Sequence, residues 1–279
     1  METNQTEARL FQAGDPLELT IQGVPAVFRY CPPGKFIMGS REGERAGHKP
    51  LPETRHEVTL TREFWLMETQ VTQTLWTATM GENPSCFKGD GARPVESILW
   101  THCESFIRRL NFRETPPYGL KFDFPTEAEW EYACRAGTET AFNVGEDITD
   151  EDANFGKHIG QTTPVKSYAP NAWGLYDMHG NVEEWCFDQP KKYSTLPLVD
   201  PVGRGYSEER VLRGGGWADG DRAYCRSAYR NCSPGDYPLP GVAENVDYYL
   251  GDIRNKGFRL ALRAVRMCEL PGDRRDRLF

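Results

Sequence analysis

The stretch FPTEAEWEYA, residues 124–133, carries the sharpest structural signal of the sequence. Thr126 and Glu129 form a capping box, in which each side chain accepts a hydrogen bond from the backbone N–H of the other residue at the start of a helix. Trp130 opens an apolar face, and Gly137 suits the residue just after a helix because it adopts a positive φ without strain. The stretch therefore predicts an amphipathic helix that packs on a core.

A second helix is predicted upstream of this one. Leu99, Cys103, Phe106 and Leu110 recur at the spacing of a single helical face, so they predict a helix with one buried stripe. Ser97 stands just before the stripe, and its hydroxyl suits the N-cap position. We therefore expect Ser97 to cap this helix.

Short strand-like runs surround the two helices. In residues 258–263, Phe258, Leu260 and Leu262 alternate with Arg259 and other residues, which predicts a half-buried antiparallel strand. The other runs are rich in Val, Thr and aromatic residues or are set between turn residues, and they cover residues 26–30, 35–38, 56–60, 64–71, 211–217 and 223–230. Two early helices and many strands predict one α+β domain.

Composition excludes several classes of protein. The chain has 279 residues, a formal net charge of −8, and 14 Phe, 12 Tyr and 7 Trp, so it has enough apolar surface for a folded core. The acidic balance disfavours nucleic-acid binding, which needs clustered positive charge. No apolar run is long enough to span a membrane. We therefore expect no nucleic-acid partner and no transmembrane segment.

The first residues, METNQTEARLFQAGD, lack the basic and apolar stretches of a signal peptide. This leaves two localisations open: a cytoplasmic protein, or an exported or cell-surface protein whose signal is not in this sequence.

Several motifs occur in order along the chain. They are GKFIMGS (34–40), Val71-Thr72 with Trp76, RPV (93–95), FPTEAEWEYA (124–133), GLYDMHGNVEEW (174–185), LRGGGW (212–217) and GFRLA (257–261). Together they resemble the sulfatase-modifying-factor family, the formylglycine-generating-enzyme-like branch of the C-type-lectin fold. The resemblance covers residues 30 to about 265.

The resemblance implies a loop-rich α+β domain with a small twisted antiparallel sheet and two main helices. We place this domain at residues 25–268, with a lead-in at 1–24 and a tail at 269–279, and we expect a monomer. Within it, the three glycines before Trp217 are expected to let the backbone approach another segment closely.

The chemistry of the family's enzymes is not matched by this sequence. As the resemblance implies, active formylglycine-generating enzymes hold copper with two cysteines, spaced C-x-x-x-x-C, directly after the residue that corresponds to Trp217; thiolates suit copper(I) because it is a soft ion. Here Ala218 follows that tryptophan, Cys225 comes later, and Cys232 is seven residues further on. We therefore expect ordinary thiols at both positions.

Iron chemistry is not matched either. The sulfoxide-synthase branch of the family holds iron with histidines, but the five histidines of this chain show no ligand spacing. We expect His179 to be a turn residue and not a catalytic base.

A structural calcium ion is the metal that the resemblance does suggest. Family members hold one through a Gly-Asn-x-x-Glu-Trp turn, and Asn181, the Val182 carbonyl and Glu184 match that turn. Oxygen ligands in a tight turn suit calcium. The alternative is a turn without metal, in which the Asn and Glu side chains bond backbone amides.

The segment 217–257 has the composition of an adaptable binding surface. Tyr offers contact area at low entropic cost, and Asp, Asn, Ser and Gly offer flexible hydrogen bonding, although they also favour a plain solvated loop. The candidate ligand-binding residues are Ala218, Asp219, Asp221, Tyr224, Tyr229, Asn231, Asp236, Tyr237, Tyr248, Tyr249, Asp252 and Asn255, with Asp247 of the same composition beside them.

This segment also resembles the variable proteins of diversity-generating retroelements. Those proteins use the same fold and vary positions through adenine mutation of Asn codons, which can yield the Ala, Asp and Tyr found here. The sequence therefore predicts a non-catalytic protein that binds a protein or other surface ligand. The alternative is a formylglycine-generating-type oxidase or a related metal-dependent oxidoreductase.

Overall fold

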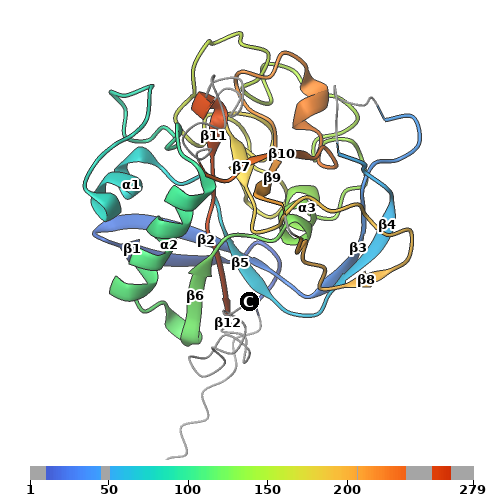
Figure 1. Ribbon diagram of the computed structural model, residues 1–279, viewed down its shortest axis with the longest axis horizontal. Coiled ribbons are helices and arrows are strands. Elements are labelled where there is room, and N and C mark those ends of the chain that lie inside the picture. Colours follow the sequence, from blue (N-terminus) through green and yellow to red (C-terminus); the bar gives the residue numbers. More distant parts are fainter. Residues whose placement is uncertain (1–10, 45–50, 206, 237–252, 265–279) are drawn as a thin grey trace, which may run out of the picture.

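The computed structural model describes residues 11–44, 51–205, 207–236 and 253–264. Tyr237, Asp247, Tyr248, Tyr249 and Asp252, which the sequence assigns to the binding surface, lie outside the described residues. In the described ranges the chain forms an α+β fold with three sheets and three α-helices, which confirms the predicted fold class (Figure 1).

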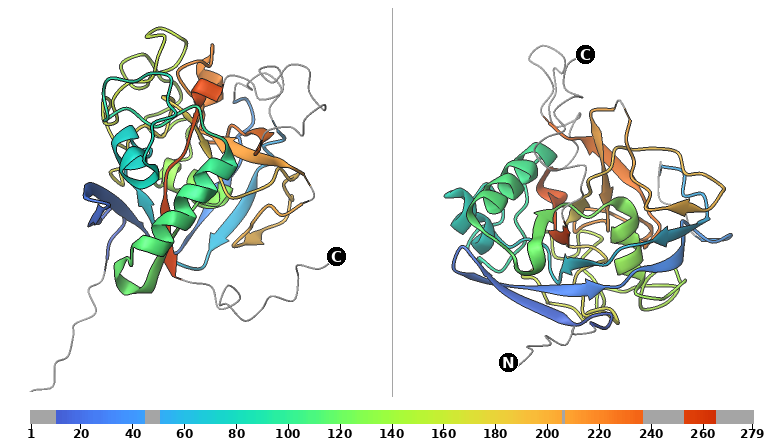
Figure 2. Two further views of the ribbon diagram at one scale, coloured as in Figure 1. Left: turned by 60° about the vertical axis from the view of Figure 1, so that its left-hand side comes forward. Right: turned by 90° about the horizontal axis from the view of Figure 1, so that it is seen from below.

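The largest sheet has five antiparallel strands and forms one side of the core. Its order is β1 (Pro16–Ile21), β2 (Val24–Cys31), β5 (Phe64–Met67), β12 (Ala261–Ala264) and β6 (Leu120–Asp123). The last strand of the described chain thus pairs between two early ones. Figure 2 shows β1 and β2 (dark blue) as a long curved ribbon with α1 and α2 on one side of it.

β1 lies inside the stretch 1–24 that was predicted as a lead-in. It pairs with β2 along its whole length, and Ile21 at its end is buried. Leu17, Leu19 and Ile21 alternate with polar residues, so the period of two that marks a strand is present in the sequence. The sheet therefore begins earlier than expected.

Two smaller sheets complete the fold. One has four strands in the order β10 (Asn231–Pro234), β9 (Glu209–Arg213), β7 (Glu183–Trp185) and β11 (Lys256–Gly257), and its β11–β7 pair is parallel. The other has β3 (Gly34–Met38), β4 (His56–Leu60) and β8 (Leu198–Val199), and its β4–β8 pair is parallel. The single small sheet that the resemblance implied is thus three sheets, two of which are mixed.

Helix α3 (Glu127–Arg135) forms as the sequence predicts. Thr126 Oγ1 accepts from the Glu129 N–H at 3.2 Å, and Glu129 Oε2 accepts from the Thr126 N–H at 2.7 Å. After the helix, Ala136 and Gly137 both have positive φ. The capping box and the glycine stop are confirmed.

Helix α2 (Trp100–Arg113) also forms, but its predicted cap is wrong. Ser97 has a φ of 62°, and its hydroxyl donates to Glu96 at 2.6 Å, so it lies outside the helix. Leu99 occupies the N-cap position, and its N–H donates to His102 Nδ1 at 3.2 Å. The predicted stripe from Leu99 to Leu110 is fully buried, as expected.

A third helix, α1 (Gln73–Met80), was not predicted. Thr72 caps it, and Trp76 stacks on Phe106 of α2 with ring centroids 5.1 Å apart. The helix has no acidic residue in its first turn and no basic residue in its last. Its sequence, QTLWTATM, is short and rich in Thr, so its local helical signal is weak.

Two predicted strands are shorter than expected or absent. The predicted strand at 211–217 ends at Arg213, because Gly214 and Gly215 adopt positive φ. The predicted strand at 223–230 instead begins with a 3₁₀ helix, η2 (Arg222–Cys225), and the ladder resumes only at β10. Two further short 3₁₀ helices are η1 (Pro117–Gly119) and η3 (Ile253–Asn255).

The predicted half-buried strand at 258–263 is buried on both sides. Regular pairing begins only at Ala261, and Phe258 to Leu262 are all fully buried, including Arg259. An alternation of apolar and charged residues normally places the charges in solvent. Here tertiary ion pairing overrides that pattern, as described below.

Candidate functional site

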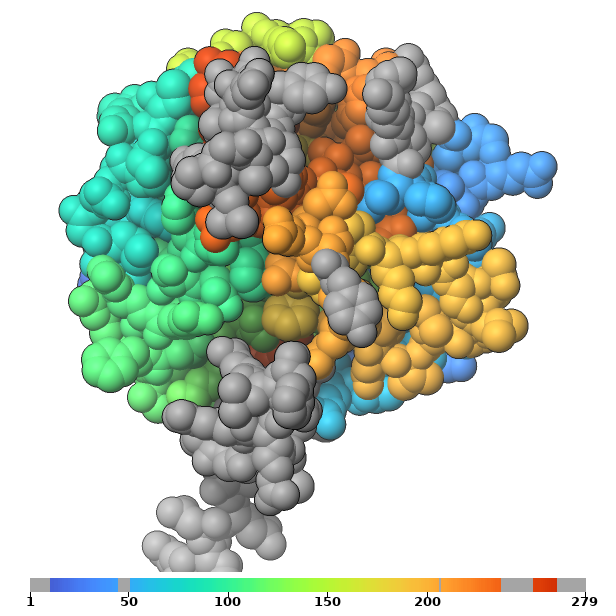
Figure 3. Space-filling view, in the orientation of Figure 1, coloured from blue at the N-terminus to red at the C-terminus, as the bar shows by residue number. Residues whose placement is uncertain are grey.

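The predicted binding segment at 217–257 is described up to residue 236 and again from residue 253. Its first part, taken together with the glycines before Trp217 as residues 214–236, runs along one face of the molecule. It leaves β9, passes Trp217 and η2, and returns to the four-stranded sheet as β10. Figure 3 shows its residues (orange) in the upper half of this face, near residues of η3 and β11 (red) and the loop near residue 150 (yellow-green).

Three glycines let the start of this segment pack closely against neighbouring residues. A Cβ on Gly214 would lie 3.1 Å from the Trp130 ring, and a Cβ on Gly215 would lie 2.7 Å from Cys225 Sγ. A Cβ on Gly216 would lie 2.2 Å from Asn255 Oδ1. Only glycine allows these approaches, so the expected close packing before Trp217 is present.

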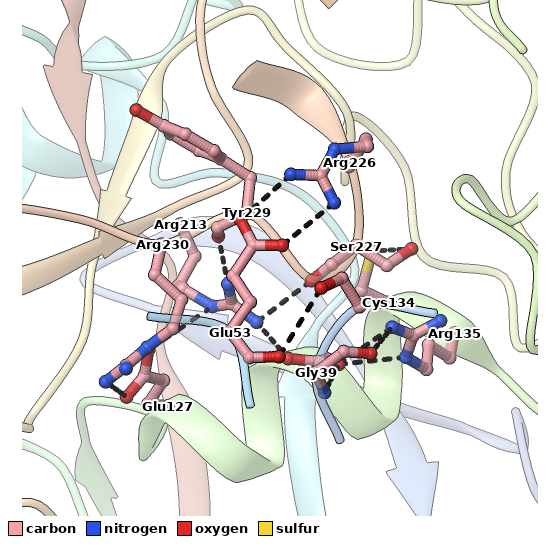
Figure 4. A network of polar contacts seen from close by, with 12 residues as sticks. Gly39, Glu53, Glu127, Cys134, Arg135, Arg213, Arg226, Ser227, Tyr229 and Arg230 are labelled. Carbon is pink, nitrogen blue, oxygen red and sulfur yellow. Dashed lines mark hydrogen bonds and ion pairs between the residues drawn. The ribbon is translucent and has the colours of Figure 1, made fainter. Parts of the chain in front are cut away.

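Arg213 anchors the segment from beneath. It is fully buried, and its Nη2 donates to Glu131 of α3 and to the Ser227 carbonyl at 2.9 Å, while its Nη1 donates to the Tyr229 carbonyl. Glu131 also pairs with Arg135 at 2.9 Å. Figure 4 shows Arg213 between the segment and α3. A single guanidinium therefore fixes two carbonyls of the segment to a helix.

Two more buried arginines hold the middle of the segment. Arg226 donates to both oxygens of Glu53 at 2.9 Å and to Glu44 at 2.9 Å. Arg230 binds Glu127 through both carboxylate oxygens, at 2.6 and 2.8 Å (Figure 4). Each of these arginines is at most 2% exposed. Bidentate pairs of this kind fix orientation as well as position.

Three predicted binding residues lie on the outer side of the segment. Ala218, Asp221 and Tyr224 are partly exposed. Asp221 caps η2 by accepting from the Ala223 N–H at 2.9 Å. The Tyr224 ring meets the Tyr229 ring edge to face, with centroids 5.2 Å apart. These three positions form the described part of the candidate binding surface.

Tyr229 does not lie on that surface. It is 3% exposed, and burial raises the pKa of its hydroxyl. Its ring supports Tyr224 from beneath. We therefore interpret Tyr229 as a supporting residue and not as one that contacts a ligand.

Asp219 and Asn255 are also engaged within the protein. Asn255 is 4% exposed, and its Oδ1 accepts from the Ala218 N–H at 3.1 Å. Its Nδ2 donates to Asp219 at 3.2 Å, and Asp219 accepts from the Gly216 N–H at 2.8 Å. Burial raises the pKa of Asp219. These side chains shape the turn after Trp217.

Asn231 and Asp236 lie at the far end of the segment. Asn231 of β10 donates to Glu183 at 2.7 Å. Burial, followed by the charge of Asp219, raises the pKa of Glu183 to about 7. Asp236 is exposed, but it lies at the first turn of α2, where Thr101 donates to it at 3.3 Å. Asp236 therefore contacts α2, and no described contact joins it to Tyr224.

The two cysteines of the segment are in environments that favour thiols. Cys225 is fully buried, and burial raises its pKa. Cys232 lies on β10, and burial, followed by the charge of Glu209, raises its pKa to about 12. Copper(I) is bound by thiolates, so binding here would have to overcome the burial that favours both thiols, at two positions that lack the family's C-x-x-x-x-C spacing after Trp217; this donor set fits the copper ion of the family's oxidases poorly.

The turn that was predicted to hold calcium is filled by donors from the protein. Glu184 accepts from Trp130 at 2.7 Å, from Gln70 at 3.1 Å and from Arg259 at 2.6 Å on each oxygen. Gln70 also donates to the Val182 carbonyl at 3.1 Å. A calcium ion would have to displace a guanidinium, so these residues do not fit it.

The Asn181 side chain bonds a backbone amide, as in the alternative of a turn without metal. It has a φ of 67°, and its Oδ1 accepts from the Thr163 N–H at 2.9 Å. Glu184, in contrast, binds side chains and not backbone amides. Across the described ranges, no group of three or more His, Cys, Asp or Glu side chains could hold a metal ion.

His179 is a structural residue of the glycine-rich turn. It is buried, its Nδ1 donates to the Cys225 carbonyl at 2.7 Å, and its Nε2 accepts from the Asn143 N–H at 3.0 Å. Burial lowers its pKa to about 4. Both ring nitrogens are therefore used within the protein.

Sequence reasoning missed the arginines that build this site. Arg213, Arg226, Arg230 and Arg259 are all buried and paired, although arginine is rarely buried. One signal was available: these arginines stand next to runs of apolar or small residues, as in RSAYR (226–230) and GFRLAL (257–262).

The part of the chain that the structure describes has no helix both long and apolar enough to cross a membrane.

Comparisons with known proteins agree with this architecture. A family model described as "Sulfatase-modifying factor enzyme 1-like domain" matches residues 24–239. The formylglycine-generating enzyme of Streptomyces coelicolor is 35% identical over 154 residues, which is 47% of this chain and 44% of that protein. Serine/threonine-protein kinase pkn1 of Chlamydia caviae is 33% identical over 223 residues, or 72% of this chain and 35% of that protein. The chain thus spans less than half the length of these relatives.

Two solved structures are similar over most of the chain. Variable protein 1 of Treponema denticola has a TM-score of 0.71 and 28% identity, and the match covers 89% of this chain and 99% of that one. PvdO from Pseudomonas aeruginosa has a TM-score of 0.68 and 24% identity, with 91% and 100% coverage, and this likeness concerns the fold alone.

Proposed function

This chain belongs to the sulfatase-modifying factor enzyme 1-like family, and from that premise we propose that it is a non-catalytic binding protein. Its ligand contacts the surface that begins at Ala218, Asp221 and Tyr224. The ligand class is a protein or another surface ligand, because Tyr with Asp and small residues is the composition of adaptable protein-binding surfaces.

The observation that carries this proposal is the division of the segment into an anchored inner side and an open outer side. Arg213, Arg226 and Arg230 hold the backbone through buried carboxylates on other elements. On the outer side, Asp221 accepts from the nearby Ala223 N–H, and the Tyr224 ring meets the Tyr229 ring. Outer side chains can therefore change while the backbone keeps its position, which is what a binding surface of variable specificity needs.

Tyr224 is the residue that we expect to contribute most to binding. Its ring is partly exposed, and it rests edge to face on the buried ring of Tyr229. A tyrosine held this way loses little conformational entropy on binding. Energetic anchors of interfaces are commonly such residues.

The likeness to a variable protein supports a further step of the proposal. Treponema denticola variable protein 1 is similar over nearly its full length. We infer that the outer positions of this chain are diversified as in the retroelement variable proteins that its sequence resembles. Ala218, Asp221 and Tyr224, which can each arise from an Asn codon by adenine mutation, lie on the outer side of the segment.

A peptide assay tests the non-catalytic part. Purified protein, supplied with copper(I), is incubated with a peptide that contains Cys-x-Pro-x-Arg, and the peptide mass is followed. We expect no conversion of the thiol to an aldehyde, because Ala218 replaces the first cysteine of the family's pair, and Cys225 and Cys232 are seven residues apart in environments that favour thiols. Conversion above a copper-only control would overturn the proposal in favour of the oxidase.

Genomic DNA tests the diversification. We expect a near-copy of the coding DNA for residues 217–257, differing only where the copy has adenine, beside a gene for a reverse transcriptase. If no such repeat exists, the diversified receptor is excluded and a fixed binding protein is left.

A displayed library tests the binding surface directly. In one library Ala218, Asp221 and Tyr224 are randomised, and in a matched library the buried Tyr229, Asn255 and Ser227 are randomised. We expect most members of the first library, and few of the second, to fold and reach the surface of yeast. Equal loss of folding in both libraries would contradict the proposed division.

A further inference from the structure

A cavity of about 320 Å³ lies beside the anchored inner side of the segment, where Arg230 and Glu127 line it, and has no role in the proposed binding surface. It is bounded by the end of β3, the start of β4, the first turn of α3 and the loop at 186–203. Met38 and His56 are paired across β3 and β4, and both line the cavity. Its volume is at the lower end of the range of about 300–1,000 Å³ for small-molecule sites.

The loop that closes the cavity is tied at its base. The Gln189 N–H donates to the Gly203 carbonyl at 2.9 Å, and the Gly203 N–H donates to Asp188. Asp188 also accepts from the Glu127 N–H at 2.8 Å, which joins the loop to the start of α3. The base of the loop is therefore fixed both to itself and to α3, so this wall of the cavity is a built feature of the fold.

Two polar atoms of the cavity lining are buried without a partner among the described residues. They are Nε2 of His56, which is 5% exposed, and the hydroxyl oxygen of Tyr193. The two rings lie side by side, with centroids 4.8 Å apart. Buried polar groups are nearly always hydrogen-bonded, so two orphan atoms in one cavity point to a ligand that bonds both.

The tautomer of His56 decides which chemistry that ligand must offer. His56 Nδ1 lies 2.9 Å from the Thr54 carbonyl oxygen, which can only accept, so Nδ1 carries the proton. In the neutral ring Nε2 is then an acceptor and needs a donor. The Tyr193 hydroxyl can donate or accept. One ligand hydroxyl satisfies both atoms, since it can donate to Nε2 and accept from Tyr193.

The buried charges of the walls are bound within the protein, while Lys191 and Lys192 line the cavity as exposed residues. Arg230 lies over the Tyr193 ring at 3.6 Å, but its guanidinium binds Glu127 and the carbonyls of Pro52 and Lys191. Met38, Ala128, Leu198, Pro201 and Val202 supply apolar wall. The interior thus suits a mainly apolar molecule without net charge.

We propose that this cavity binds a small, mainly apolar alcohol or phenol, whose hydroxyl group donates to His56 Nε2 and accepts from the Tyr193 hydroxyl. A larger cavity of about 440 Å³ beside β12 is a weaker candidate. There Thr61 is already bonded to Asp200, and Arg263 to Glu129.

Three probes of nearly equal shape test the proposal on the full chain. Phenol can donate and accept, anisole can only accept, and toluene can do neither. We expect phenol to bind at millimolar concentration or below, and anisole and toluene to bind roughly tenfold more weakly, because they leave the His56 acceptor unpaired. Dissociation constants come from saturation-transfer NMR titrations. Equal affinities for phenol and anisole, or no binding of phenol, would overturn the proposal.

Two variants locate the probe. Tyr193→Phe keeps the ring beneath Arg230 and removes only the hydroxyl, so phenol affinity should fall about fivefold while toluene affinity stays unchanged. Leu198→Trp fills the cavity and should abolish binding of all three probes. Tyr118→Phe, at an exposed tyrosine, is the control. Unchanged phenol affinity in Tyr193→Phe would exclude this site. None of these outcomes bears on the peptide assay or on the genomic test above.

Discussion

The inner and outer sides of the segment at 214–236 differ in what holds their side chains. On the inner side, arginine guanidinium groups are removed from water and bound to carboxylates of α3 and of the chain near β4. On the outer side, Ala218, Asp221 and Tyr224 keep contact with solvent. Separate residues therefore set the backbone position and the surface chemistry, so the outer side chains can change while the backbone stays in place.

Removing a carboxylate from the inner side should have the largest effect. Glu131→Ala would leave buried Arg135 without a carboxylate and Arg213 with only Glu127, 3.8 Å from its Nε, which should cost about 3–5 kcal/mol of the free energy of unfolding. Urea denaturation measures it. In the matched control, Glu57→Ala breaks the exposed pair with Lys35 and should cost about 0–1 kcal/mol. Similar losses in the two variants would contradict the anchoring role of Glu131.

The next largest difference is expected between the stability losses caused by replacing Tyr229 and Tyr224, whose rings are in contact. Tyr229→Ala removes a buried ring and should cost about 3 kcal/mol of stability. Tyr224→Ala removes a partly exposed ring and should cost about 1 kcal/mol, mainly the ring contact. Thermal and urea unfolding compare them. A larger loss for Tyr224 would mean that its ring belongs to the core and not to the outer side.

Glycine substitutions test the close approach at the start of the segment. Gly215→Ala places a Cβ 2.8 Å from the Tyr224 carbonyl oxygen and forces an L-residue to a φ of 63°, so it should cost roughly 2 kcal/mol. Gly220→Ala has nothing within 4 Å of its Cβ and should change stability by less than about 0.5 kcal/mol. Equal effects, measured by urea unfolding, would show that Gly215 is not tightly packed.

The smallest expected effect is a change in the pH dependence of stability. Glu183 has a pKa raised from 4.5 to about 7 in the folded protein by burial and by Asp219, so the folded state holds this proton more tightly than the unfolded state. Its contribution to stability is therefore full below pH 4.5 and is lost as the pH rises through 7.

Glu183→Gln cannot titrate, so its free energy of unfolding should fall less than that of the parent over this pH range, by roughly 1–2 kcal/mol. Asp188 and Asp177 have raised pKa values and contribute in the same direction as Glu183, and His179 has a lowered pKa and contributes in the opposite one. These three groups act in parent and variant alike, whereas the charge of Asp219 acts directly on Glu183, so the difference reports the Glu183–Asp219 pair. Urea unfolding at several pH values measures it, and parallel curves would contradict the raised pKa.

The sequence by itself determined the elements that depend on neighbours along the chain. The helix after Thr126 follows from a capping box that closes within three residues, and the buried stripe of α2 follows from helical spacing. The glycines before Trp217 predicted a close approach because no other residue allows one. The ordered series of motifs predicted the family and the α+β class.

Only the tertiary structure decided which charged residues are buried. Arg259 occupies a position that alternation assigns to solvent, yet it pairs with Glu184, 75 residues away, and thereby fills the turn that was expected to hold calcium. Tyr229 and Asn255 are residue types common on surfaces, but both are buried. Tyr229 packs against Tyr224, and Asn255 bonds the Ala218 N–H. The physical reason is that a charge or a polar ring can be buried wherever a partner meets it, and the partners here come from distant parts of the chain.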